Sequence, residues 1–129
     1  MTVPCLAVAL PALPASVATT RHRVREFAEL HGASPEVRAA IALAVSEAVG
    51  NAVRHAYPSG SGDVEVAMDI EQDELELVVL DDGTGFTTRP VTGLGIGLMV
   101  MRAVSDAFEI RDRPSGGVEV WMRFALAAH

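Results

Sequence analysis

The segment Glu47-Ala-Val-Gly-Asn51-Ala-Val-Arg-His55-Ala-Tyr57 places three polar side chains at four-residue spacing in a stretch that otherwise has the pattern of a buried helix. At about 100° per residue, Glu47, Asn51 and His55 form one stripe of such a helix, beside an apolar stripe. A carboxylate and an amide at the border of a core usually face a cavity, so the pattern indicates a site. A solvated rim with an i,i+4 hydrogen-bonded pair is the alternative. The apolar stripe consists of Val37, Ile41, Val45, Ala48 and Ala52.

The composition is that of a globular chain with an acidic balance. The 129 residues are 50% hydrophobic and 21% charged, so we expect residues 1–129 to form a single domain. A formal charge of -7 argues against direct binding to nucleic acid or anionic lipid. Every basic residue is an arginine, and the absence of lysine excludes a P-loop of the usual kind.

The N-terminal segment and the cysteine content bear on the compartment. Cys5 is the only cysteine, so it cannot form an internal disulfide, which suits a reducing compartment. Three prolines interrupt the apolar segment 3–14, and the sequence contains no uninterrupted apolar run of about 18 residues. We therefore expect a cytoplasmic protein that does not bind membranes.

Hydrophobic periodicity predicts eight elements in the order β-α-α-β-β-α-β-β. Hairpins dominate this order and few parallel crossovers are implied. This favours an α+β fold, namely a two-layer sandwich with a mostly antiparallel, mixed sheet and helices on one face. The predicted strands span about 6–10, 64–70, 75–79, 108–111 and 118–126, and the predicted helices span about 16–31, 35–56 and 96–107.

A second motif, Asp81-Asp-Gly83-Thr-Gly85, follows a predicted strand. Its glycines would let the backbone approach a ligand that any Cβ would exclude. The carboxylate of Asp81 could accept a hydrogen bond from an exocyclic amine, which distinguishes adenine from guanine. An ordinary Asp-Gly turn has the same letters and is the alternative.

A third motif, Gly93-Leu-Gly95-Ile-Gly97-Leu98, opens the last predicted helix. Exposed backbone N–H groups and the positive end of the helix dipole would meet there, which predicts an anion site. A flexible loop before a helix is the alternative. The dinucleotide-binding fingerprint fits poorly, because no parallel βαβ unit surrounds the segment and the glycine spacing differs.

In this order the three motifs resemble the N, G1 and G2 boxes of the GHKL ATPase superfamily, which has the Bergerat fold. Within it, the chain is most similar to the small anti-sigma-factor serine kinases of bacterial stress and sporulation signalling. The resemblance extends from Leu13 to Trp121. The absence of a histidine-containing dimerisation helix argues against a complete sensor histidine kinase.

The resemblance implies ATP and Mg²⁺ as cofactors and assigns roles to the motif residues. Asn51 would provide an oxygen ligand to Mg²⁺, Glu47 would be the general base, and Asp81 would bind the adenine amine. His55 is a candidate phosphate or lid contact, with a solvated helix end as the alternative. A solvated helix end is also the favoured interpretation for Arg54. The remaining nucleotide contacts implied by the resemblance are Gly83, Gly85, Gly93, Gly95 and Gly97.

The implied activity is an ATP-dependent protein serine kinase that acts as an anti-sigma factor. Its implied partners are a sigma factor and a STAS-type antagonist protein, which it would phosphorylate; the family resemblance also allows a homodimer. An ATP-binding, partner-switching module without kinase activity is the main alternative. An ATPase fragment that acts only in a larger assembly is a third.

Two features depart from the family pattern. Val118 stands where relatives commonly have threonine, so adenine binding is expected to be weaker. The segment Thr87–Thr92 is short for a nucleotide lid, which would leave the phosphates more exposed. Arg89 in this segment is a candidate contact to the γ-phosphate or a partner, with a plain loop arginine as the alternative. Trp121 is expected to be a sheet residue that packs on a helix.

Overall fold

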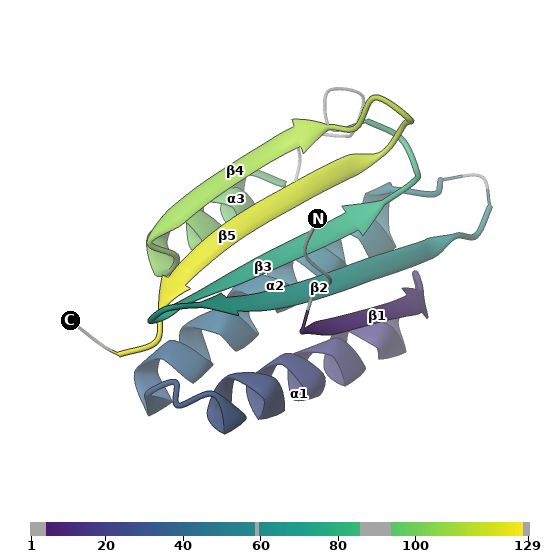
Figure 1. The fold of residues 1–129 in the computed structure, drawn as a ribbon. Coiled ribbons are helices and arrows are strands. Elements are labelled where there is room, and N and C mark those ends of the chain that lie inside the picture. Colours follow the sequence, from purple (N-terminus) through teal and green to yellow (C-terminus); the bar gives the residue numbers. More distant parts are fainter. Residues whose placement is uncertain (1–4, 59, 86–93, 128–129) are drawn as a thin grey trace.

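The computed structural model describes residues 5–58, 60–85 and 94–127, which form a five-stranded sheet with three helices on one face (Figure 1). This confirms the predicted two-layer α+β class and the predicted order of the elements. The elements are β1 (Leu6–Pro11), α1 (Pro14–Leu30), α2 (Pro35–His55), β2 (Asp63–Glu71), β3 (Glu74–Asp81), α3 (Leu94–Val104), β4 (Ala107–Asp112) and β5 (Val118–Ala125).

The strand order is β1-β2-β3-β5-β4, and each neighbouring pair within the described residues is antiparallel. The prediction allowed a mixed sheet, which these ladders do not contain. The chain leaves β3, forms α3, and returns through the β4–β5 hairpin, which inserts β5 beside β3. Because β3 and β5 are antiparallel, the end of β3 at Asp81 lies beside the start of β5 at Val118.

The core lies between the sheet and the helices. Alternate residues of β2, β3 and β5 are buried, as the period of a half-buried strand requires. Burying an aliphatic side chain of this size contributes roughly 1.5–3 kcal/mol, so this layer provides much of the stabilisation. Large side chains that are almost fully buried include Phe124, Ile41, Met68, Leu75, Leu77, Met101 and Met122.

Helix boundaries follow local chemistry. The Ser34 side chain accepts a hydrogen bond from Val37 N at 3.2 Å and caps α2, with Pro35 in the first turn. Helix α1 begins at Pro14, two residues before the predicted start, because this proline fits the first helical turn. Helix α3 spans Leu94–Val104 instead of the predicted 96–107. No helix in the described ranges combines the length and apolarity needed to cross a membrane.

Trp121 lies on the open face of the sheet, which corrects the expectation that it packs on a helix. Its neighbours Val120 and Met122 are buried under the helices, so Trp121 projects to the opposite side of β5. Its indole Nε1 donates to Glu76 Oε1 at 2.8 Å, and the Arg123 guanidinium lies 5.9 Å from the ring centroid. The alternation of buried and outward-facing residues along β5 predicts this orientation.

Candidate functional site

The polar stripe of α2 lies where the sequence placed it, at the edge of the core. Asn51 is 3% exposed, whereas Glu47 and His55 are partly buried. The Asn51 Oδ1 atom accepts a hydrogen bond from Arg54 Nη2 at 3.2 Å. Arg54 is exposed, as expected for a solvated helix end, but its guanidinium also holds the Asn51 amide in place.

The start of α3 lies directly against this stripe. A methyl group built on Gly97 would lie 2.9 Å from Glu47 Oε2 and 3.7 Å from Asn51 Oδ1. A side chain here would push the Glu47 carboxylate aside, whereas its distance to Asn51 would be an ordinary van der Waals contact. Glu47, Asn51 and Gly97 therefore form one cluster, although Gly97 is far from the other two in the sequence.

Of the other two glycines of the third motif, Gly95 is described by the structure and Gly93 is not. A methyl group on Gly95 would meet no atom within 4 Å, so Gly95 borders open space. Gly93 and the segment 87–92, with Arg89, lie outside the described residues. Their assigned roles stay predictions.

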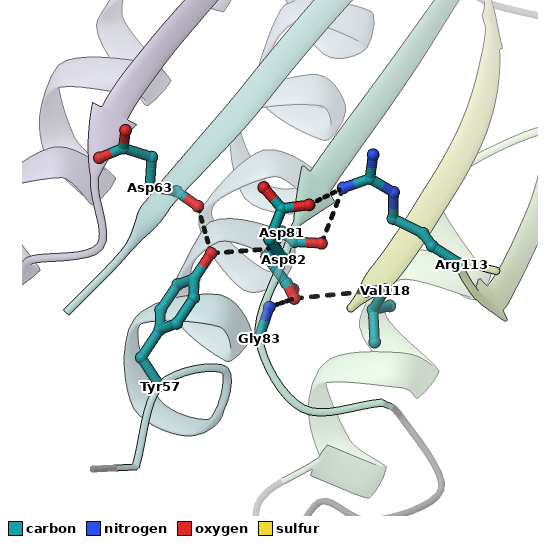
Figure 2. Close-up of polar contacts among 7 residues, drawn as sticks. All are labelled: Tyr57, Asp63, Asp81, Asp82, Gly83, Arg113 and Val118. Atoms are coloured by element: carbon teal, nitrogen blue, oxygen red, sulfur yellow. Dashed lines mark hydrogen bonds and ion pairs between the residues drawn. The ribbon is translucent and has the colours of Figure 1, made fainter. Parts of the chain in front are cut away.

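Asp81 is buried at the end of β3, at 4% exposure. Its Oδ1 atom accepts hydrogen bonds from Gly83 N at 3.1 Å and from Val118 N at 3.3 Å (Figure 2). Val118 has no hydroxyl, but its backbone N–H contacts Asp81. Two backbone donors therefore orient this carboxylate despite the departure at position 118.

The loop after Asp81 packs against the C-terminal end of α2. A methyl group on Gly83 would lie 1.9 Å from Ala56 O. Thr84 N donates to Ala56 O at 2.8 Å, and Thr84 Oγ1 donates to His55 O at 3.0 Å. The sequence explained Gly83 by a closely approaching ligand. The structure adds that the protein's own backbone already requires a glycine there.

Tyr57, the last residue of the first motif, was given no role by the sequence, but its hydroxyl group also holds this loop. Its Oη donates to Asp63 O at 2.6 Å and accepts from Asp82 N at 2.9 Å (Figure 2). Burial, helped by the nearby carboxylates of Asp81, Asp82 and Asp63, raises the pKa of Tyr57 above 10.0, while the bond from Asp82 N opposes this shift. The phenol therefore stays protonated at neutral pH and remains a donor.

Helix α2 connects the two halves of the site. Asn51 and His55 are one turn apart, about 6 Å along the axis, so the Glu47–Asn51–Gly97 cluster adjoins the loop that begins at Asp81. The described residues contain no group of three His, Cys, Asp or Glu side chains arranged to hold a metal. A cation at Asn51 would therefore need oxygen ligands from a bound molecule, as Mg²⁺ commonly has.

The β4–β5 turn packs against the end of β3, and a substitution of Gly117 tests this contact. Gly117 has a backbone φ of +89°, and a methyl group built on it would lie 1.9 Å from Asp81 O. Gly32 has a similar φ of +86°, but a methyl group built on it would have no atom within 4 Å. We expect Gly32→Ala to lose about 1 kcal/mol of unfolding free energy, from backbone strain alone. Gly117→Ala should lose about 3 kcal/mol or more, because overlap is added to the same strain. Urea unfolding of both variants measures the difference, and equal losses would contradict the tight contact.

Comparisons with known proteins bear on this geometry. A family model described as the histidine kinase-like ATPase domain matches residues 10–124. An anti-sigma F factor of Clostridium acetobutylicum is 33% identical over 100 residues, which cover 67% of this chain and 70% of the relative. The serine-protein kinase RsbW of Bacillus subtilis is 30% identical over 130 residues, which cover 88% of this chain and 80% of the relative.

A solved structure supports the same likeness. The crystal structure of the RsbU and RsbW domains of a Mycobacterium tuberculosis protein superposes with a TM-score of 0.76 and 28% sequence identity. The match covers 97% of this chain but only 33% of the solved chain. The similarity therefore extends over nearly all of this chain and about a third of that larger protein.

Proposed function

The chain belongs to the histidine kinase-like ATPase domain family, and from this premise we propose that it is an ATP-dependent protein serine kinase that acts as an anti-sigma factor. In this proposal it binds a sigma factor and phosphorylates a STAS-domain antagonist on serine. The unphosphorylated antagonist competes for the kinase and releases the sigma factor. Residues 1–129 act as one ATP-binding domain, in the cytoplasm where these partners work. The names of the relatives, an anti-sigma F factor and serine-protein kinases RsbW, support this proposal.

One observation carries the proposal, the position of Glu47 against the start of α3. A carboxylate that is partly buried lies beside a helix start where a methyl group on Gly97 would be 2.9 Å from Oε2. A helix start attracts phosphate groups through its N–H groups and dipole. A carboxylate at such a place is suited to accept the proton of a hydroxyl group that attacks a phosphate.

The residues present fit a magnesium nucleotide. The space that a side chain at Gly97 would fill lies against Asn51. The amide oxygen of Asn51 accepts a hydrogen bond from Arg54 with one lone pair and keeps a second lone pair. Bound Mg²⁺ would supply charge neutralisation at the phosphate oxygens. Asn51 is the proposed ligand, while Gly95 and Gly97 leave room for the phosphates at the start of α3.

The protein's own groups then have separate tasks. The Asp81 carboxylate accepts a hydrogen bond from the adenine amine and so selects the base. Glu47 accepts the proton of the partner's serine hydroxyl at a carboxylate oxygen. Since phosphoryl transfer needs little covalent help, holding these groups in position provides most of what the protein contributes.

The proposal is tested by incubating the purified protein with Mg-ATP and candidate STAS-domain proteins. We expect a phosphoserine on one antagonist, detected by mass spectrometry, and none when ATP is replaced by ADP. Nucleotide-dependent partner binding with no phosphoserine on any antagonist would contradict the kinase and indicate a partner-switching module without catalysis.

A further inference from the structure

Arg113, which lies outside the three sequence motifs, reaches the end of β3 from the β4–β5 turn. Arg113 N donates to Gly117 O and Gly116 N donates to Arg113 O, each at 3.0 Å, so its backbone is fixed in the turn. Its Nη1 atom donates to Asp81 O at 2.9 Å and to Asp82 Oδ1 at 2.7 Å (Figure 2). One guanidinium nitrogen thus binds two consecutive residues of the loop.

The contact to the Asp81 carbonyl matters more than the ion pair. Asp82 is 76% exposed and Arg113 is 25% exposed, so solvent screens their mutual attraction and the pair alone contributes little. The bond to Asp81 O, in contrast, is partly buried and reaches the backbone of a buried residue. Arg113 therefore acts mainly on the geometry of the backbone.

The peptide unit between Asp81 and Asp82 is held at both ends. Its carbonyl accepts from Arg113, and its N–H donates to the Tyr57 hydroxyl. Because a peptide unit is planar, holding its carbonyl and its N–H sets the orientation of the whole plane. The Cα atom of Asp81 lies in that plane, so its position is fixed with the peptide unit, and the bonds from Gly83 N and Val118 N then orient the carboxylate.

We propose that Arg113 is a positioning residue for recognition of the nucleotide base, acting with Tyr57 through the peptide unit that carries Asp81. The inference rests on the proposed function, because it takes Asp81 as the group that binds adenine. The side-chain hydrogen bonds of Arg113 go to the loop of Asp81, and its backbone bonds stay within its own turn. Its loss therefore weakens nucleotide binding and base selectivity, and leaves the transfer step unchanged.

The test measures the Kd for Mg-ATP and Mg-GTP by calorimetry, and KM and kcat for ATP in the transfer assay. Arg113→Ala should raise the Kd and KM for ATP about three- to tenfold and change kcat by less than about twofold. It should also bring the Kd values for ATP and GTP closer together. Arg113→Lys, which keeps a donor at this position, should restore most of the affinity. Arg111→Ala is the matched control, since this neighbour in the hairpin pairs with Glu109 and Glu119 instead.

If Arg113→Ala fails to fold, Tyr57→Phe tests the same inference, because it removes the hydroxyl that accepts from Asp82 N, and it should also raise the Kd for ATP with kcat unchanged. Asp82→Ala removes one of the two acceptors and should have a smaller effect than Arg113→Ala, and the double variant should cost no more than Arg113→Ala alone. Unchanged ATP affinity in Arg113→Ala, or a loss of kcat at constant KM, would overturn the inference. A wild-type protein that binds no ATP would overturn the proposed function instead.

Discussion

Glu47→Gln should reduce phosphoryl transfer to a partner serine by about 10²- to 10⁴-fold, while Mg-ATP binds within about twofold of the wild-type affinity. The substitution keeps the size of the side chain beside Gly97 but removes its negative charge and its ability to accept a proton. Transfer is measured by phosphoserine formation under single-turnover conditions, and binding is measured by calorimetry.

Glu36→Gln is the matched control for this prediction. Glu36 is exposed in the first turn of the same helix, so the variant carries the same change of charge away from the cluster. We expect it to transfer phosphate at the wild-type rate. Transfer by Glu47→Gln at the wild-type rate would contradict its role as general base, and loss of ATP binding would instead make Glu47 part of the nucleotide site.

Asp81→Asn should weaken ATP binding by about a hundredfold or more, because it changes an acceptor of the base into a donor. The Oδ1 atom of Asp81 is occupied by Gly83 N and Val118 N. An asparagine that keeps these two bonds must place its NH₂ group where the second carboxylate oxygen was. That NH₂ group would then face the adenine amine, donor against donor.

Calorimetry with ATP, ADP and GTP checks this prediction. The wild-type protein should prefer adenine nucleotides strongly, and Asp81→Asn should lose both affinity and preference. Asp73→Asn, at an exposed position in the β2–β3 turn, makes the same chemical change and should bind like the wild type. Unchanged ATP affinity in Asp81→Asn would show that the base binds elsewhere.

Much of the fold could be predicted because it depends on local periodicity. The helical spacing of α2 identified the buried stripe and the polar stripe beside it, and alternation identified the strands with errors of one or two residues. The proximity of the first and third motifs followed from the family resemblance, and the contact of Gly97 with Glu47 and Asn51 agrees with it. The expectation that Trp121 packs on a helix was wrong, because the alternation of β5 places this residue on the open face of the sheet.

The support of the Asp81 loop could not be predicted, because it consists of tertiary contacts without a repeating pattern. Tyr57 and Arg113 are far apart in the sequence and meet at one peptide unit. Tyr57 ends the first motif but was given no role there, and Arg113 belongs to none of the three motifs. Gly83 looked like a ligand-contacting glycine, yet the backbone at Ala56 also excludes a side chain there. A sequence motif indicates that a glycine is needed, but not whether a ligand or the protein's own backbone lies against it.

The most direct test of the central claim is a crystal structure with Mg²⁺ and a non-hydrolysable ATP analogue. The account predicts the adenine at Asp81, the metal at Asn51, and the phosphates against the start of α3 at Gly95 and Gly97. A nucleotide bound elsewhere would contradict it, for example in the depression beside the β4–β5 turn that Arg111 and Ser115 help to line.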